Sequence, residues 1–382
     1  MVQQVRQGQS LRHVARTWRV SLLTVQRWVA RAKGQRLDRV DWNDHPPIPQ
    51  HTRRTPPSTE DLILELRTEL KQHSALGEFG APAIQRALQT QGLPSVPSVA
   101  TISRILERRG ALDGQRRVRR PPPPRGWYLP EVAAGRAELD SFDVIEGLVI
   151  QGGVPVEVLT GISLLGGLAV AWPGPPVTAR DVVARVTEHW RAVGRPRYAQ
   201  FDNDTCFQGA HQHADCISRV MRLCLSLDIV PVFTPVQEPS FQAVLENFNG
   251  LWQDKVWRRF RFTGYRDLRA QSAAYIRARR LRAAPRIEAS PRRAFPAGWV
   301  LDLQAAPQGR IVFLRRTSAE GTAVLLGRRF VVDSKWPHRL VRCDVDLDHH
   351  RIRFHALRRR DPTAQPLLRE VPYRLPLRRF KE

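Results

Sequence analysis

The sequence predicts a multidomain α/β protein with all-α units at the N-terminus, an α/β core around a mixed sheet, and a small β-barrel at the C-terminus. Helical periodicity with cap signals dominates the first 110 or so residues. Apolar runs typical of strands then alternate with amphipathic helices over residues 134–285. Residues 300–360 hold short strands separated by turns, which is typical of a barrel.

The composition points to a nucleic-acid partner. Of the 382 residues, 61 are Lys or Arg and 36 are Asp or Glu, a net charge of +25. Such an excess repels itself unless a polyanion offsets it, and arginine suits bidentate contact with phosphate. No apolar stretch approaches the ~20 residues of a membrane span. The start lacks the apolar segment of a secretory signal, and the four cysteines form no evident disulfide framework. We therefore expect a cytoplasmic, bacterial, nucleoid-associated protein with no membrane partner.

Residues 1–45 predict a helix-turn-helix DNA-binding domain. Two short amphipathic helices lie within residues 10–33, and Ser21 is placed to cap the second. An ordinary helical hairpin is the alternative. The side chains expected to reach the major groove are Thr24, Gln26, Arg27 and Arg31.

A second helix-turn-helix domain is predicted over residues 58–115, after a Pro-rich linker at 46–57. Ser98 is expected to cap its second helix, and tandem units favour DNA binding more than either unit alone. The side chains expected to face DNA are Thr101, Arg104 and Arg108.

A basic, Pro-rich linker at residues 116–133 separates these units from the core, and a basic tail follows at 361–382. Polyproline is stiff, so it spaces modules while nearby arginines follow the phosphates of DNA. The linker residues expected to bind DNA are Arg116, Arg117, Arg119 and Arg120.

Three carboxylates in the core predict a metal-dependent active site. Asp140 and Asp202 each end an apolar run that reads as a strand, and Glu246 begins a helix. Two strand-end carboxylates and one from a facing helix are able to hold two divalent ions around a phosphodiester. Oxygen ligands without His or Cys select Mg²⁺ or Mn²⁺.

Asp143 is a rival of Asp140 for this site. The two lie three residues apart on one strand and so point to opposite faces, which means that only one joins the cluster. We expect it to be Asp140. On the helix that begins at Glu246, Asn249 and Gln253 share its face and are expected to position the substrate.

A zinc site is the alternative metal site. Two cysteines and two histidines can form a tetrahedral set, although the spacing here matches no familiar finger, and we interpret these residues as part of a loop. They are Cys206, His211, His213 and Cys216.

The segments ELDSFD, FDNDTCF and VLENFNG resemble the catalytic core of insertion-sequence transposases and retroviral-type integrases, the ribonuclease-H-like DDE recombinases. The upstream segments LGEFGAPAIQRAL and PSVATISRILERRG are similar to the helix-turn-helix region of bacterial integrase-core transposases, and the C-terminal part resembles the small barrels that follow such cores. The resemblance implies a five-stranded mixed sheet with Asp140, Asp202 and Glu246 as metal-binding triad.

The chain departs from this family pattern at Asp204, where glycine is usual after Asp-Asn. We expect the added Cβ to strain the turn and the added charge to perturb the metal site. Replacing Asp204 by glycine is accordingly expected to keep or raise activity.

The leading hypothesis is a DNA transposase that binds transposon ends, cleaves 3′ ends with two Mg²⁺ or Mn²⁺ ions, and transfers the strands into target DNA. Because two ends must be joined, a homo-oligomer of at least two copies on double-stranded DNA is implied. Two alternatives remain open. One is a DNA-binding regulator or domesticated remnant with an inactive core, and the other is a metal-dependent nuclease without strand transfer.

Overall fold

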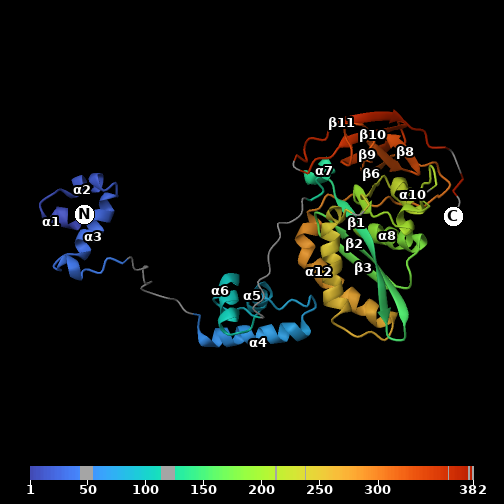
Figure 1. The fold of residues 1–382 in the computed structure, drawn as a ribbon. Helices are drawn as coiled ribbons and strands as arrows, with labels where there is room; N and C mark the ends of the chain where they lie inside the picture. The colour runs from blue at the N-terminus through green and yellow to red at the C-terminus, as the bar shows by residue number, and fades with distance from the viewer. Residues whose placement is uncertain are drawn as a thin grey trace. The chain divides into compact units, whose positions relative to one another are not determined.

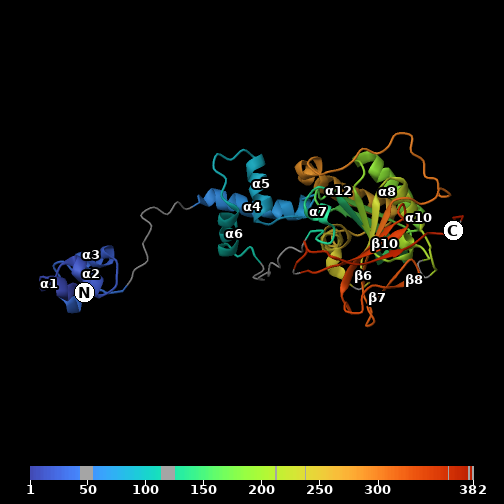
Figure 2. The ribbon, with the colours of Figure 1, turned by 90° about the horizontal axis from the view of Figure 1, so that it is seen from above.

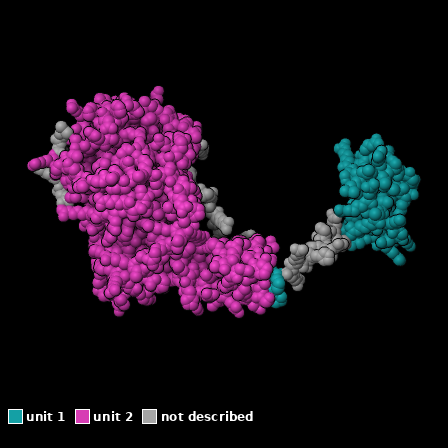
Figure 3. Space-filling view, turned by 180° about the vertical axis from the view of Figure 1, so that it is seen from behind, with its two compact units in different colours: residues 1–57 teal, residues 58–382 magenta. Residues whose placement is uncertain are grey.

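The computed structural model describes residues 1–43, 55–112, 125–210, 213–236, 238–359, 361–376 and 379–380. The chain forms two compact units, residues 1–57 and 58–382 (Figures 1 and 3). No helix within these described ranges is both long and apolar enough to cross a membrane.

The first unit is a small helical domain built around a helix-turn-helix. Ser10 and Ser21 cap its second and third helices, each accepting a hydrogen bond from the backbone N–H three residues on. Arg19 takes the left-handed conformation, with φ of 51°, and so turns the chain between these helices. Val14 and Val25 are fully buried where the helices meet. The helices are α1 (Val2–Arg6), α2 (Leu11–Thr17), α3 (Leu22–Arg31) and the 3₁₀ turn η1 (Leu37–Arg39).

The second unit begins with three helices that pack around their own apolar cluster. Ile63, Ile84 and Ile102, one from each helix, are fully buried there. Ser98 caps the third helix by accepting a hydrogen bond from the N–H of Thr101. The helices are α4 (Pro57–His73), α5 (Ala81–Thr90) and α6 (Val99–Arg108).

Five strands of a larger mixed sheet form the centre of the second unit, and this mixed α/β character agrees with the sequence prediction. The first three strands are antiparallel neighbours, and the fourth and fifth run parallel to the first, in the order β3-β2-β1-β4-β5. The bounds are β1 (Leu139–Ile150), β2 (Val154–Ser163), β3 (Ala169–Gly174), β4 (Tyr198–Phe201) and β5 (Val230–Phe233).

Helices cover both faces of this sheet (Figure 1). Helices α8 and α10 pack on one face, where Trp190 and Met221 join Phe142 in one core cluster. On the other face, α11 and α12 form a second cluster that includes Ile145 and Phe248. The remaining helices and turns are α7 (Pro130–Ala133), α8 (Ala179–Val193), α9 (Thr205–Gln208), α10 (Arg219–Ser226), η2 (Pro239–Phe241), α11 (Ala243–Trp252), the π-helical turn η3 (Gln253–Trp257) and α12 (Tyr265–Glu288).

The C-terminal strands extend this sheet instead of forming a separate barrel. Strand β6 pairs in parallel with β5, and β9, β10 and β11 follow in antiparallel order, so the sheet has nine strands. Only β7 and β8 pair apart from it, as a hairpin. Figure 1 shows β6, β9 and β10 directly against the core, and Figure 2 shows β6 and β10 there from above. The bounds are β6 (Arg310–Arg316), β7 (Thr322–Leu325), β8 (Arg328–Val331), β9 (Leu340–Asp346), β10 (Arg351–Ala356) and β11 (Leu367–Pro372).

The prediction of an independent barrel at residues 300–360 is therefore wrong. The physical reason lies at the edge of β5, which β6 covers. Phe313 of β6 stacks on Phe233 of β5 with ring centroids 5.2 Å apart, and both are fully buried. Short strands are recognisable in the sequence, but the sheet edge on which they pair is not.

We expect a chain that ends at Val300 to lose cooperative unfolding. Removing β6 exposes the edge of β5 together with the apolar surface around Phe233. Thermal unfolding monitored by circular dichroism measures the cooperativity, and binding of a dye specific for apolar surface measures the exposure. In the full chain, Phe313→Ala should lower the free energy of unfolding by about 3–5 kcal/mol. An unchanged unfolding midpoint in the truncated chain would support an independent C-terminal domain.

Candidate active site

Asp143, on β1, faces the side of the sheet that α11 covers. Asn249 of α11 donates a hydrogen bond from Nδ2 to Oδ2 of Asp143, at 2.9 Å. Burial, followed by the negative charges of Asp202 and Glu246, raises the pKa of Asp143 to about 6. The charges of Asp202 and Glu246 therefore both act on the Asp143 carboxylate in the folded chain.

The pairing of β1 with β4 explains why Asp143 and Asp202 are neighbours. The two strands run parallel, and Asp140 pairs with Ala199 and Ser141 with Gln200. Continuing this register by two residues places Asp143 level with Asp202, just past the end of β4. The preceding residues agree, because the rings of Phe142 and Phe201 stack at 5.8 Å.

Asp202 and Glu246 complete the group from two other elements. Asp202 is half-buried and accepts a hydrogen bond from the backbone N–H of Asp204 at 3.0 Å. Burial and the charges of Asp204 and Glu146 raise its pKa. Glu246 lies in the first turn of α11 and is exposed, and its partial burial raises its pKa as well.

Asp140 lies on the opposite face and does not join these carboxylates, so the choice of Asp140 over Asp143 is wrong. Its two oxygens accept hydrogen bonds from the guanidinium of Arg292, both at 2.8 Å, and one also accepts from Nε1 of Trp190 at 2.9 Å. The side chain is only 3% exposed. Burial alone raises the pKa of Asp140, but the charge and hydrogen bonds of Arg292 bring it below its ordinary value.

The sequence contained part of the information needed to choose between Asp140 and Asp143. Asp140 and Asp143 face different helices, as the alternation of residues along a strand predicts. A usable signal was the Phe-Asp pair that occurs in both strands, Phe142-Asp143 and Phe201-Asp202. Arg292 gave no signal, since it lies 152 residues from its partner in the sequence.

The two predicted substrate-positioning residues have different surroundings. Asn249 is buried and fixes Asp143, while its Oδ1 has no hydrogen-bond partner. Gln253 begins the π-helical turn η3, and its role stays a prediction.

Asp204 is not strained, contrary to expectation. Its φ of −60° and ψ of 149° are ordinary extended values, and its side chain caps α9 by accepting a hydrogen bond from the N–H of Cys206 at 2.7 Å. Asn203 also holds this turn by donating to the carbonyl of Thr234 at 2.8 Å. The expected crowding of charge is present, because Asp204 raises the pKa of Asp202.

The donor set of the three carboxylates fits a hard divalent cation. All three ligands offer oxygen, and their mutual repulsion at Asp143 is of the kind that a cation relieves. Within the described residues, however, no three His, Cys, Asp or Glu side chains stand close enough together to hold a metal ion. This finding also covers Cys206, His213 and Cys216 of the alternative zinc site, whereas His211 lies outside the described residues.

The predicted DNA-contacting side chains of the helix-turn-helix units differ in their exposure and in their contacts within the chain. Gln26 and Arg104 are exposed. The guanidinium groups of Arg27 and Arg31 both lie over the ring of Trp28. Three of the predicted side chains bond within the chain, Thr24 to Ser21, Thr101 to Ser98 and Arg108 to Glu60. Arg116, Arg117, Arg119 and Arg120 lie outside the described residues.

No family model and no curated protein matches the chain. Solved structures that match include the catalytic core domain of BIV integrase, at 17% identity and a TM-score of 0.28, covering 36% of this chain and 80% of that one. A simian T-cell lymphotropic virus intasome, in complex with PP2A regulatory subunit B56 gamma, matches at 14% identity and a TM-score of 0.36. The match covers 78% of this chain and 95% of that one. The HTLV-2 integrase catalytic core domain, in complex with magnesium, matches at 13% identity and a TM-score of 0.25. The match covers 32% of this chain and 70% of that one. All three TM-scores are low, so the interpretation rests on this chain's own strand order and carboxylates.

We expect Asp140→Asn and Asp143→Asn to have opposite effects on stability. Asp140→Asn leaves the buried Arg292 without its counter-charge, which should lower the free energy of unfolding by about 3–5 kcal/mol. Asp143→Asn removes a carboxylate that repels its neighbours and should keep or raise stability. Urea unfolding of both variants without divalent metal measures the difference. Equal losses would contradict the separation of the two aspartates.

Proposed function

We propose that this chain is a DNA transposase of the integrase-core type, and that Asp143, Asp202 and Glu246 form its catalytic triad. The observation that carries the proposal is that the pairing of β1 with β4 sets Asp143 level with Asp202, and that the charges of Asp202 and Glu246 both raise the pKa of Asp143. The strand order β3-β2-β1-β4-β5, with helices on both faces, supports a ribonuclease-H-like core. The net charge of +25 supports a nucleic-acid substrate.

The residues around the triad would prepare it for phosphoryl transfer. Asn249 keeps the Asp143 carboxylate oriented, and the turn that Asn203 and Asp204 stabilise keeps Asp202 at the strand end. Glu246 lies exposed on α11, where it is accessible to a substrate. Two Mg²⁺ or Mn²⁺ ions, held by the three carboxylates, would supply charge stabilisation and activation of the attacking oxygen.

The proposed reaction has two in-line displacements at phosphorus. In the first, water forms a bond to phosphorus while the bond to the 3′ oxygen breaks, which leaves a 3′-hydroxyl and a 5′-phosphate. In the second, that hydroxyl attacks a phosphodiester of the target, and the target's own 3′ oxygen leaves. Because both steps have the same geometry, one set of carboxylates can serve both.

The two helix-turn-helix units are proposed to bind the transposon ends. The N-terminal residues of a recognition helix are those that reach base edges, and Gln26 and Arg104 are exposed on α3 and α6. Joining two ends requires at least a dimer on DNA. A DNA-binding regulator with an inactive core and a nuclease without strand transfer remain the alternatives, and the main support for the regulator weakens because Asp204 causes no backbone strain.

We expect Asp143→Asn, Asp202→Asn and Glu246→Gln each to abolish cleavage and strand transfer while DNA affinity is kept. Each change removes one charged ligand from a site whose ions stabilise the transition state by several kcal/mol. Assays on end-containing duplexes with Mg²⁺, and with the metal chelated, measure the effect.

Asp254→Asn is a suitable control, because Asp254 is exposed in η3 and pairs with Arg258. The control should retain activity. Activity that survives in Asp143→Asn would exclude the proposed triad.

We expect Asp204→Asn to keep or raise strand transfer on pre-cut ends. Asparagine retains the cap on α9 but removes the charge that raises the pKa of Asp202. Asp204→Gly removes the charge and the cap together, so comparing the two variants separates the two effects. A large loss in Asp204→Asn would show that the Asp204 charge itself takes part in catalysis.

A further inference from the structure

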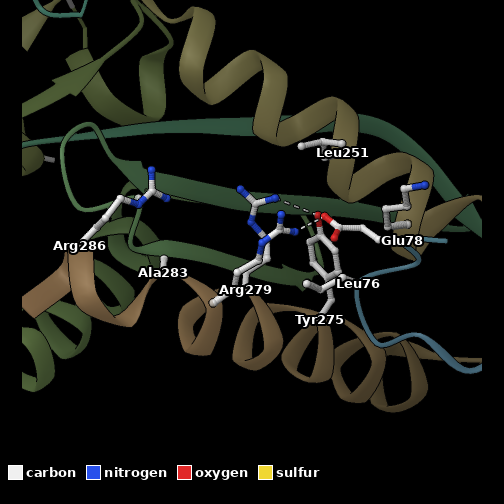
Figure 4. Close-up of a pocket in the computed structure, with 10 residues that line it drawn as sticks. Leu76, Glu78, Leu251, Tyr275, Arg279, Ala283 and Arg286 are labelled. Atoms are coloured by element: carbon white, nitrogen blue, oxygen red, sulfur yellow. Dashed lines mark hydrogen bonds and ion pairs between the residues drawn. The ribbon is translucent and has the colours of Figure 1, made fainter. Parts of the chain in front are cut away.

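A basic pocket of about 530 Å³ lies between the segment before α5, the end of α11 with η3, and α12 (Figure 4). Its charged and polar lining consists of Lys255, Tyr275, Arg279, Arg282, Arg286 and Glu78. We use the name basic pocket for this set. None of these residues belongs to the triad.

The cations of the basic pocket repel one another, and this repulsion lowers the stability of the fold unless an anion is bound. Arg279, Arg282 and Arg286 are spaced three and four residues apart, so they share one face of α12, and Lys255 faces them from η3. Like charges on one helix face are destabilising. Four cations against one carboxylate therefore leave an excess of positive charge directed at one cavity.

Among the described residues, Glu78 is the carboxylate that lines the basic pocket. It forms ion pairs with Arg282 and with Arg86 of α5, the latter at 2.7 Å. Figure 4 shows the Glu78 carboxylate directed toward arginines of the pocket. It comes from the helical region of residues 58–112, so a side chain of the second helix-turn-helix unit supplies the pocket's internal anion.

The other cations of the basic pocket have only neutral contacts among the described residues. Arg279 donates to Oη of Tyr275 at 3.3 Å and lies over the ring of Phe248, and its Nε is buried without a partner. Lys255 donates to the carbonyl of Gly77 at 3.2 Å. Arg286 lies so close to Gly167 that a Cβ there would stand 2.7 Å from its guanidinium. Donors are thus directed at the cavity without an acid to match them.

We propose that the basic pocket binds one phosphate of the DNA backbone, which takes the place of the Glu78 carboxylate. Guanidinium forks match phosphate oxygens, and the Glu78 carboxylate already bridges Arg282 of the pocket and Arg86 of α5. One wall belongs to the second helix-turn-helix unit, and α11 leads from another wall back to Glu246. The inference rests on the proposed function.

The position of the basic pocket relative to Glu246 also predicts the spacing between the bound phosphate and the phosphodiester that is cleaved. Lys255 follows Glu246 by nine residues, or about 14 Å at the rise of a helix. That distance corresponds to about four base pairs of duplex. For a duplex that runs along α11, the bound phosphate should then lie about four base pairs from the phosphodiester that is cleaved.

The first test measures the salt dependence of DNA affinity in the full chain without divalent metal. For a labelled 40-bp duplex, Arg286→Ala should reduce the slope of log affinity against log salt by about 0.9, as expected for one lost phosphate contact. Arg277→Ala is the matched control, since Arg277 is exposed on the same helix outside the basic pocket. Equal slopes for the two variants would overturn the proposal.

A second variant is expected to gain affinity, a result that a loss of folding cannot produce. Glu78→Gln removes the internal anion but keeps the side chain's shape, so affinity for the same duplex should rise several-fold at low salt. Weaker binding by Glu78→Gln would contradict a competition between Glu78 and a phosphate.

A third arm distinguishes a backbone phosphate from free phosphate and tests the predicted spacing. A neutral methylphosphonate about four base pairs from the cleavage position should weaken binding to the wild type, but not further in Arg286→Ala. Inorganic phosphate that raises thermal stability through Arg286, with no effect of the methylphosphonate, would show a free-anion site and refute the inference.

The outcomes also separate this inference from the proposed function. Binding is measured without metal and does not depend on catalysis. A triad that is required for cleavage, with an unchanged salt slope in Arg286→Ala, would refute the basic pocket alone. A changed slope in a chain that never cleaves DNA would refute only the proposed chemistry.

Discussion

The parallel pairing of β1 with β4 is the constraint on which the candidate site depends. Backbone hydrogen bonds fix this register near Asp140 and Ala199, and side chains three residues further along inherit it. Asp143 and Asp202 then stand level on one face, while Phe142 and Phe201 stack on the other. A slip by one residue would direct one carboxylate into the apolar core, so the fold and the chemistry share the same register.

The buried pair of Asp140 and Arg292 has a structural part in this arrangement. Arg292 follows α12, and its guanidinium also donates to the carbonyls of Val193, the last residue of α8, and of Gly194. One cation therefore ties the end of α8, the start of β1 and the segment after α12 together. A charge so deeply buried is tolerated only with its partner in place, so Asp140 and Arg292 stabilise the fold as a pair.

The C-terminal strands change how the core is closed. In an isolated five-stranded sheet, β5 would present an open edge. Strand β6 covers that edge, and the Phe233–Phe313 stack joins the two parts through a shared apolar cluster. The loop region beyond β5 is tied to the same strands, because Arg315 of β6 donates to the carbonyl of Thr234. The elements that hold Asp202 are therefore supported by residues more than a hundred positions away.

The sequence by itself determined the mixed α/β order of elements and the helix caps at Ser21 and Ser98, and it singled out two of the three carboxylates of the proposed site. These features depend on local periodicity and on side chains that act on their own backbone. It also showed that Asp140 and Asp143 face opposite ways. Only the tertiary structure decided which face α11 covers, that Arg292 neutralises Asp140, and that β6 joins β5. Each of these is a contact between segments far apart in the chain, and pairing of strand edges and of charges leaves no periodic pattern along the sequence.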